Sequence, residues 1–316
     1  MHWRVQWHES LPSTNTYLRE LLVREPYLAA GAIVATTHKT AGRGRHDRTW
    51  AGAPGRDLAA SIVLRERVSQ ECLPILPMAA ALAVRAALVG LGVDAQVKWP
   101  NDVLVKGQKI CGILAEVAPA HTRTRTNTDK HGHKKRDHGT GVREEPTVNR
   151  SPSTVHAPQA QAGSPGNVDA GSCHASQSPP TSPPEISNHK AQPSPPPQTV
   201  VLGIGLNVNM PHQDAQRIQP PATSLAIETA QLHDPAEVLG RVLDALQEIL
   251  PVWRTHGFPG LRAQWMAAVH GLGQPVTVRS PAFERTGILV GFDDAGQLRL
   301  RDAAGEEHTI SAGEVL

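Results

Sequence analysis

The apolar residues of this chain follow two spacings, one typical of strands and one typical of helices. Short β-branched runs bounded by glycine, proline or asparagine predict strands, which fall at residues 31–36, 58–64, 94–98, 103–105, 110–117 and 199–209. Apolar positions three and four residues apart predict helices, which fall at residues 10–25, 76–92, 234–250 and 261–269. The pattern therefore predicts a chain that mixes helices with strands along most of its length.

Capping residues mark the ends of the predicted helices. Ser13 or Thr14 stands at the N-cap of the first helix, and Asp234 followed by proline is a strong start for the long one. Proline interrupts a helix because it lacks the backbone N–H and its ring clashes with the preceding turn. Pro251 is therefore predicted to end the long helix, and a second short helix is predicted from Leu261 onward.

Beyond Gly273 the predicted strands become short and closely spaced. They fall at residues 275–279, 287–292, 297–301 and 307–310, separated by turns rich in Asp, Ala and Gly. Closely spaced strands of this kind predict a small barrel appended to a larger domain. We therefore divide the chain into a main domain, residues 1–271, and a barrel, residues 272–316.

Residues 118–198 interrupt the main domain with a different composition, rich in Ser, Pro, Thr, His, Gln and Asn. Such a segment cannot bury enough apolar area to offset the roughly 1–2 kcal/mol that ordering each backbone residue costs, so we predict disorder. Strand-like runs precede and follow it, and it therefore most simply replaces a hairpin tip and is dispensable. Its basic, histidine-rich early part is expected to be a solvated tether rather than a metal-binding or polyanion-binding arm.

Charge and cysteine content narrow the class of protein. The 31 basic and 29 acidic residues nearly balance, which argues against a chain that binds nucleic acid or a membrane surface as a whole. Three cysteines without a C-x-x-C pair predict a reducing, cytoplasmic setting and no zinc site. The N-terminus has no apolar leader, and the most apolar stretch, 73–93, is broken by prolines and an arginine. We expect a soluble protein.

An Arg/Gly loop between the first two predicted strands carries the strongest chemical signal. It interleaves arginines with glycines at Gly42, Arg43, Gly44, Arg45 and Arg48. Glycines let the backbone turn tightly, so its N–H groups and the guanidinium forks can converge on one anion. No helix pattern follows, and neither the P-loop nor the dinucleotide-binding motif is present. Taken alone, the loop is more simply a solvated basic loop, and a nucleic-acid contact comes next.

Three other stretches place polar or small residues where strands or helices end. Residues 13–15 (Ser-Thr-Asn) can either cap a helix or contact a neutral polar ligand. Residues 98–102 (Lys-Trp-Pro-Asn-Asp) stop a strand, and Lys109 stands at the base of the hairpin that follows, as a surface charge or a fixed cation. The glycines of residues 203–207 (Gly-Ile-Gly-Leu-Asn) mark either a bulge or a close approach.

Together and in this order, these motifs resemble the biotin protein ligases, also called biotin–acetyl-CoA-carboxylase ligases. The resemblance rests on residues 13–15, 42–50, 98–102, 109–114 (Lys-Ile-Cys-Gly-Ile-Leu), 203–207 and the closing Gly-Glu-Val of residues 313–315. It covers nearly all of the chain outside the insertion. It implies an α+β fold with a central mixed β-sheet and packed helices, as in the class II synthetase-like catalytic domain, followed by a small SH3-like barrel.

The family joins biotin to one lysine of a biotin carboxyl carrier protein domain in two steps. Biotin is first activated by ATP as biotinyl-5'-AMP, because a carboxylate is a poor electrophile at neutral pH. Two anions must meet in that step, which calls for arginine, lysine and Mg²⁺. The resemblance nominates no residue as a metal ligand.

The resemblance assigns roles residue by residue. It implies catalytic roles for Lys109, Arg43 and Arg45. It implies biotin contacts from Ser13, Thr14, Asn15, Lys39, Arg43, Gly44, Arg45 and Lys109. It implies ATP or adenylate contacts from Gly42, Arg48, Trp50, Asn101, Asp102 and Asn207. Asp102 is also the motif carboxylate nominated to assist the target lysine, with a structural capping role as the alternative.

Two positions depart from the family pattern. Lys39 stands where the family usually has glutamine, which puts a charge near a neutral ring or ribose and leaves the role of this residue open. Asp47 stands where glycine is usual, and aspartate tolerates a left-handed backbone better than most residues.

Other functions are weighed against biotin ligation. Ser13 lies too close to Met1 for a helix-turn-helix domain, so specific DNA binding is not expected, and a homodimer is left open. Lipoate and octanoate ligases share the two-step logic, but residues 98–102 and the terminal barrel favour biotin. A nucleic-acid-binding module would instead use the Arg/Gly loop and the basic part of the insertion.

Overall fold

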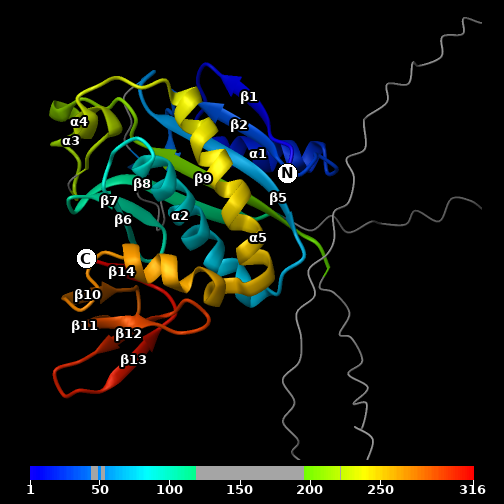
Figure 1. Ribbon diagram of the computed structural model, residues 1–316. Coiled ribbons are helices and arrows are strands. Elements are labelled where there is room, and N and C mark those ends of the chain that lie inside the picture. Colours follow the sequence, from blue (N-terminus) through cyan, green and yellow to red (C-terminus); the bar gives the residue numbers. More distant parts are fainter. Residues whose placement is uncertain (44–48, 51–53, 119–195, 221) are drawn as a thin grey trace, which may run out of the picture. The chain divides into compact units, whose positions relative to one another are not determined.

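A seven-stranded mixed sheet forms the centre of the fold (Figure 1). The computed structural model describes residues 1–43, 49–50, 54–118, 196–220 and 222–316. The strands of the sheet are β1 (Arg4–His8), β2 (Ala32–Thr36), β5 (Leu58–Glu66), β6 (Ala95–Lys98), β7 (Asp102–Val105), β8 (Gln108–Val117) and β9 (Gln198–Leu206). They lie in the order β1-β2-β5-β9-β8-β7-β6. β1 and β2 are parallel and the other neighbours are antiparallel, so the predicted mixed sheet is confirmed.

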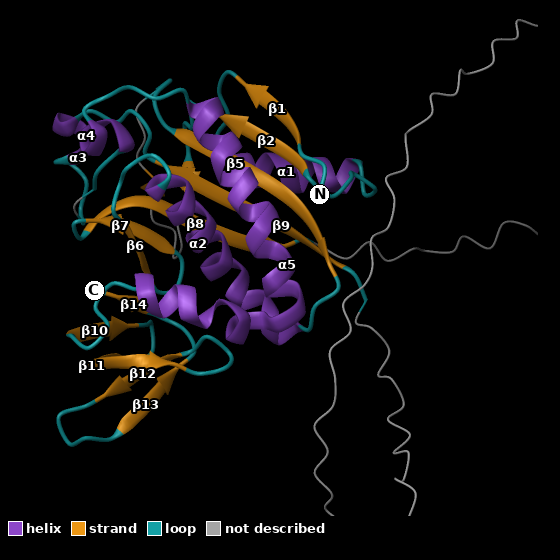
Figure 2. Ribbon diagram, in the orientation of Figure 1, coloured by secondary structure: helices purple, strands orange, loops and turns teal. Residues whose placement is uncertain are grey.

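Helices cover both faces of the sheet (Figure 2). α1 (Thr14–Arg24) packs Leu18 and Leu22 into a cluster with Val63 of β5, and we call this side the α1 face. The opposite side is covered by α2 (Leu76–Val89), which follows the 3₁₀ helix η2 (Gln70–Ile75), and by α5 (Pro235–Ala268). Because strand residues alternate between faces, Ile62 and Leu64 point to the side of α2 and α5.

The capping prediction for α1 is confirmed. Ser13 is its N-cap, and the Ser13 Oγ accepts a hydrogen bond of 3.3 Å from the Thr16 N–H. Two short helices, α3 (His212–Ala215) and α4 (Leu225–Thr229), lie between β9 and α5.

The predicted end of the long helix at Pro251 is wrong. α5 continues through this proline to Ala268, with one break at Gly257, where φ is 58° and ψ is −146°. Its buried stripe continues on both sides of Pro251, through Leu250 and Trp253. Burial of this stripe outweighs the backbone hydrogen bond that the proline removes. The separate helix predicted from residue 261 is therefore the part of α5 beyond Gly257.

The most apolar stretch of the chain is a core element. Gln70–Val89 is long and apolar enough to cross a membrane by length and composition alone, but its most apolar window is 61% buried inside the protein. Its buried residues pack in the cluster that also contains the apolar stripe of α5. The stretch therefore has the burial of a core helix in a folded protein.

The strands on either side of the insertion are antiparallel neighbours. Val117 of β8 pairs with Val200 of β9, and the Ala118 N–H donates to the Thr199 carbonyl at 2.8 Å. The predicted place of the insertion, at the end of a hairpin, is confirmed. The prediction of disorder over residues 118–198 is wrong at its two ends, because Ala118 is buried and Gln198 belongs to β9. Residues 119–195 lie outside the described residues.

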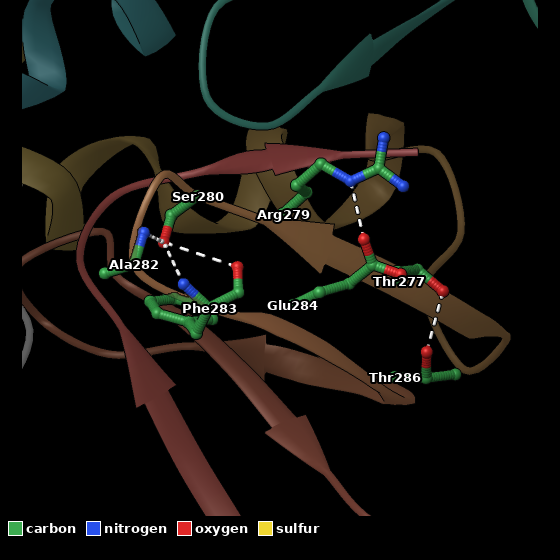
Figure 3. A network of polar contacts seen from close by, with 7 residues as sticks. All are labelled: Thr277, Arg279, Ser280, Ala282, Phe283, Glu284 and Thr286. Carbon is green, nitrogen blue, oxygen red and sulfur yellow. Dashed lines mark hydrogen bonds and ion pairs between the residues drawn. The ribbon is translucent and has the colours of Figure 1, made fainter.

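The C-terminal strands form a separate five-stranded antiparallel sheet. It consists of β10 (Pro275–Arg279), β11 (Glu284–Phe292), β12 (Leu298–Arg301), β13 (Glu307–Ile310) and β14 (Glu314–Val315), in the order β13-β12-β11-β10-β14. Figure 3 shows the turn between β10 and β11, where the Ser280 Oγ accepts from the Phe283 N–H at 3.2 Å and Arg279 pairs with Glu284 at 2.6 Å. All four predicted C-terminal strands are confirmed.

A buried ion pair ties β5 to α5. The Arg254 guanidinium donates two hydrogen bonds, of 2.7 and 2.8 Å, to the Glu66 carboxylate, and Glu66 is 1% exposed. A carboxylate buried this completely depends on its partner, because removal of the guanidinium would leave an uncompensated charge.

Arg254→Ala is therefore expected to lower the free energy of unfolding by about 3 kcal/mol, measured by urea denaturation. Arg279→Ala is the matched control, because its ion pair with Glu284 is exposed and should contribute less than about 1 kcal/mol. Equal effects of the two substitutions would show that the buried pair contributes no more than a surface pair.

Shortening the insertion tests whether it belongs to the fold. A chain in which a short glycine-rich linker replaces residues 119–195 is expected to fold and to gain up to about 2 kcal/mol, because each halving of a loop recovers about 0.6 kcal/mol. Thermal unfolding checks this, and a shortened chain that no longer unfolds cooperatively would contradict the prediction.

Candidate functional site

One row of cross-strand partners brings the sequence motifs together. Directly paired residues cross the whole sheet in the order His8, Thr36, Ala59, Gly205, Gly112, Asp102 and Lys98, and we call them the motif row. Lys98 and Asp102 bound one motif, while Gly112 and Gly205 belong to two others. The segment that contains the Arg/Gly loop leaves the sheet directly after Thr36. Motifs far apart in the sequence therefore meet on one line of the sheet.

The motif row faces α1, and its three central residues, Ala59, Gly205 and Gly112, are small. We call these three residues the floor. Ser61 lies two residues from Ala59 on β5 and contacts α1, so alternation along the strand places Ala59 on the α1 face as well. Its partners Gly205 and Gly112 have no side chain. Three adjacent strands therefore present almost only backbone at this point, which allows a ligand to lie close to the sheet.

A β-bulge turns Lys109 toward this floor. Val103 pairs with Cys111 but Leu104 pairs with Lys109, so Ile110 is an extra residue in β8. The bulge places Lys109 on the same side as Asp102, and the Lys109 Nζ lies 2.7 Å from the Asp102 Oδ1. The lysine is thus held by a rigid hairpin next to a carboxylate. Its predicted role as a fixed cation stays a prediction.

The N-terminus of α1 supplies a buried polar cluster beside the floor. Thr14 and Asn15 are 5% and 8% exposed, and the Ser61 Oγ lies 2.7 Å from the Thr14 Oγ1 and 2.5 Å from the Asn15 Oδ1. Gly203 makes this contact possible, because a Cβ at that position would lie 2.1 Å from the Asn15 Oδ1. Of the two alternatives for these strand glycines, Gly203 therefore marks a close approach.

The side-chain amides of Asn101 and Asn207 each bond to a backbone carbonyl of β8. The Asn101 Nδ2 donates to the Ile113 carbonyl at 2.6 Å. The Asn207 side chain, 2% exposed, donates to the Thr223 carbonyl at 2.9 Å and to the Lys109 carbonyl at 3.4 Å. The second Asn207 bond places that residue beside the Lys109 backbone, and Asn101 directly precedes Asp102, the partner of Lys109. The predicted contacts of both asparagines with a nucleotide stay predictions.

Lys39 interacts electrostatically with Asp57 and Cys111. Burial lowers the pKa of Lys39 to about 8, although Asp57 and Cys111 act against this shift. Burial raises the pKa of the Cys111 thiol, and Lys109 and Lys39 both oppose that rise. The two lysines therefore act on one buried thiol from different segments. The Asp57 Oδ1 also accepts from the Val208 N–H at 3.0 Å, which joins the start of β5 to the end of β9.

The Arg/Gly loop is described only in part. Its short strands β3 (Gly42–Arg43) and β4 (Thr49–Trp50) pair with each other, Gly42 with Trp50 and Arg43 with Thr49. Gly44, Arg45, Asp47 and Arg48 lie outside the described residues. The predicted anion clamp therefore stays a prediction.

Sequence reasoning missed three polar residues of this region, Asp57, Ser61 and Glu116. Ser61 and Glu116 each stand alone among apolar strand residues, and a lone polar residue in such a strand is the signal that could have marked them. Asp57 directly precedes β5, next to Arg56, and carries no such signal. Their partners come from distant segments, so no local motif contains them.

Family comparisons define the class of protein. Residues 7–127 match the biotin/lipoate A/B protein ligase family, and residues 271–316 match the C-terminal domain of biotin protein ligases. The two stretches together cover more than half of the chain. The chain belongs to the biotin/lipoate A/B protein ligase family and, within it, to the biotin protein ligases.

Individual relatives agree with this assignment. A biotin–[acetyl-CoA-carboxylase] ligase from Paracoccus denitrificans is 29% identical over 311 residues, which span 96% of this chain and 98% of the relative. One from Mycobacterium tuberculosis is 28% identical over 90% of this chain and 79% of the relative. The structure of a biotin protein ligase from Aquifex aeolicus in complex with biotin and ATP has the same fold, with a TM-score of 0.65 and 22% identity over 99% of this chain and 97% of that one. The resemblance drawn from the motifs is confirmed.

The lowered pKa of Lys39 predicts a pH-dependent penalty on folding. The unfolded chain, with a lysine pKa of 10.5, holds this proton more tightly than the folded chain, with a pKa of about 8. The penalty is fully present below pH 8 and disappears as the pH rises through 10.5. Lys39→Gln is therefore expected to stabilise the protein by about 2 kcal/mol at pH 7 and by progressively less toward pH 10.

Denaturant titrations of the Lys39→Gln variant and the unmodified chain at pH 7, 8.5 and 10 measure this difference. Arg217→Gln is the control, since it removes one positive charge from a side chain that is 79% exposed. A gain from Lys39→Gln that is constant across the three pH values would contradict the prediction.

Proposed function

We propose that this chain is an ATP-dependent ligase that activates biotin as biotinyl-5'-AMP and transfers it to a specific lysine of a biotin carboxyl carrier protein. The proposal is supported most directly by the motif row, which groups Asp102, the bulge-directed Lys109 and the buried polar cluster around a floor without large side chains. Family membership supports the same reaction.

The first step brings together two negatively charged reactants. A carboxylate oxygen of biotin attacks the α-phosphorus of ATP, pyrophosphate leaves, and a mixed anhydride forms. Charge accumulates on phosphate oxygens in the transition state, and preorganised cations stabilise it without reorganisation at the moment of reaction. We assign this stabilisation to Lys109, with Arg43 and Arg45 from the Arg/Gly loop. These three are the proposed catalytic residues.

The proposed binding roles are those that the family resemblance implies. Ser13, Thr14 and Asn15 are proposed to contact the ureido ring of biotin, and Lys39 and Gly44 to contact the same substrate. Gly42, Arg48, Trp50, Asn101, Asp102 and Asn207 are proposed to contact ATP or the adenylate. Mg²⁺ is proposed to enter with the nucleotide, held chiefly by its phosphates, since Asp102 is already paired with Lys109.

In the second step the amine of the target lysine attacks the acyl carbon of biotinyl-5'-AMP. The amine must lose a proton, an amide bond forms and AMP leaves. Asp102 remains our nominee to assist this proton transfer, and its pairing with Lys109 is equally consistent with a purely structural role.

The remaining organisation is also a proposal. We assign residues 1–271 to the biotin/ATP-binding catalytic domain, with the insertion 118–198 inside it, and residues 272–316 to the SH3-like barrel. The partner is proposed to be a biotin carboxyl carrier protein domain in the cytoplasm. Specific DNA binding and membrane association are not expected, and a homodimer is left open.

Incubation with ATP, Mg²⁺ and biotin, lipoate or octanoate separately, followed by mass detection of the acyl-adenylate, tests the function. Biotinyl-5'-AMP is the expected product. A preference for lipoate or octanoate would favour the alternative ligase, and salt-sensitive RNA or DNA binding without adenylation would favour a nucleic-acid-binding module.

Lys109→Ala is expected to slow adenylation about 100-fold, because it removes roughly 3 kcal/mol of transition-state stabilisation. Lys106→Ala is the matched control on the same hairpin, since the Lys106 side chain is 81% exposed and pairs with Glu228. Its rate of adenylate formation should stay within about threefold of the unmodified chain. A Lys109→Ala variant as active as the control would remove Lys109 from the catalytic set.

A further inference from the structure

A continuous polar chain runs from the surface of α1 to the buried cluster beside the floor. The Arg19 Nη1 lies 2.8 Å from the Glu116 Oε1, and the Asn15 Nδ2 donates to the Glu116 Oε2 at 2.8 Å. The Asn15 Oδ1 then meets Ser61, whose Oγ also contacts Thr14. Sequence reasoning assigned no role to Glu116, Arg19 or Ser61.

Glu116 fixes the orientation of the Asn15 side-chain amide. A carboxylate accepts hydrogen bonds and cannot donate them, so the amino end of Asn15 must face Glu116. The carbonyl end therefore faces Ser61, which has to donate its single hydroxyl proton to it. The Ser61 hydroxyl also points toward the Thr14 Oγ1 as a donor, so its single proton is shared between the two oxygens. The carboxylate therefore fixes the orientation of the Asn15 amide.

This orientation leaves defined polar groups for a ligand. The second amide hydrogen of Asn15 is a donor, and the Thr14 hydroxyl, which accepts from Ser61, keeps one lone pair and its own proton. A cyclic urea carries the complementary groups, a carbonyl acceptor beside N–H donors. The dithiolane of lipoate and the alkyl chain of octanoate carry neither, so the ordered cluster discriminates against them.

Close packing against the backbone of β9 leaves the Asn15 side-chain amide little freedom to move. A Cβ at Gly203 would overlap Asn15, so the amide lies directly against β9. Glu116 reaches it from β8, where it pairs with Val201, a member of the α1-face cluster. A carboxylate from the sheet thus orients an amide from the helix.

We propose that Glu116 is a positioning residue that makes the pocket selective for the ureido ring of biotin by fixing the orientation of the Asn15 amide. The inference rests on the proposed function. Glu116 acts through Asn15, so its removal should weaken biotin binding without slowing the chemistry once biotin is bound.

The test compares biotin and ATP kinetics of Glu116→Ala, Glu116→Gln and Arg19→Ala in the adenylation assay. Glu116→Ala should raise the KM for biotin about 10- to 100-fold, with kcat and the KM for ATP nearly unchanged. Glu116→Gln should have a smaller effect, because its amide oxygen can still accept from Asn15. Arg19→Ala is the control, since it removes the outer ion pair and keeps the carboxylate in place.

A double-mutant cycle separates positioning from general structural damage. In an Asn15→Ala background, Glu116→Ala should change the KM for biotin by less than about threefold. Equal effects in both backgrounds, or a fall in kcat at unchanged KM, would overturn the inference. If the unmodified chain makes no biotinyl-5'-AMP, the proposed function fails together with it. If that chain is active and Glu116→Ala keeps its biotin KM, only the inference fails.

Discussion

One extra residue in β8 decides which way Lys109 points. Without the bulge at Ile110, strict alternation would place Lys109 on the side of Cys111, which is packed into the core beneath α2. An ammonium group there would lose its hydration without reaching the motif row. The bulge instead sets it against Asp102, so that a cation is already positioned and paired before any substrate arrives. The proposed adenylation chemistry depends on that orientation.

The rest of the site depends on positions in the sheet that have little or no side chain. Ala59, Gly205 and Gly112 remove side chains from three adjacent strands, while Asn15 closes over Gly203 from α1. Burial lowers the pKa of Lys39 to about 8, because the ammonium of this residue is poorly solvated. Poor solvation also strengthens interactions between the lysines and anionic reactants, because water screens them less. Poor solvation of Lys39 therefore destabilises the fold and favours the proposed chemistry.

Local patterns predicted most of the elements. The Ser13 cap and the apolar face of α1 were evident from helical spacing, and the turn at Lys106 and Gly107 adopts the positive φ values, 51° and 78°, expected of a tight hairpin. Pro251 was misjudged because tertiary burial overrode a local rule. Register, strand order and the bulge depend on pairings between distant segments. Ser61, Asp57 and Glu116 act only through those pairings, and no local motif in the sequence marks them.

In the proposed mechanism, Lys109 contacts oxygens shared by an acyl group and a nucleotide. A crystal structure of the chain with a non-hydrolysable analogue of biotinyl-5'-AMP tests it most directly. We expect the Lys109 Nζ to lie about 2.7–3.2 Å from an oxygen at the acyl–phosphate junction, with the ureido ring beside Thr14 and Asn15. An analogue bound away from the motif row, or a Lys109 that makes no contact with it, would show that the proposed mechanism is wrong.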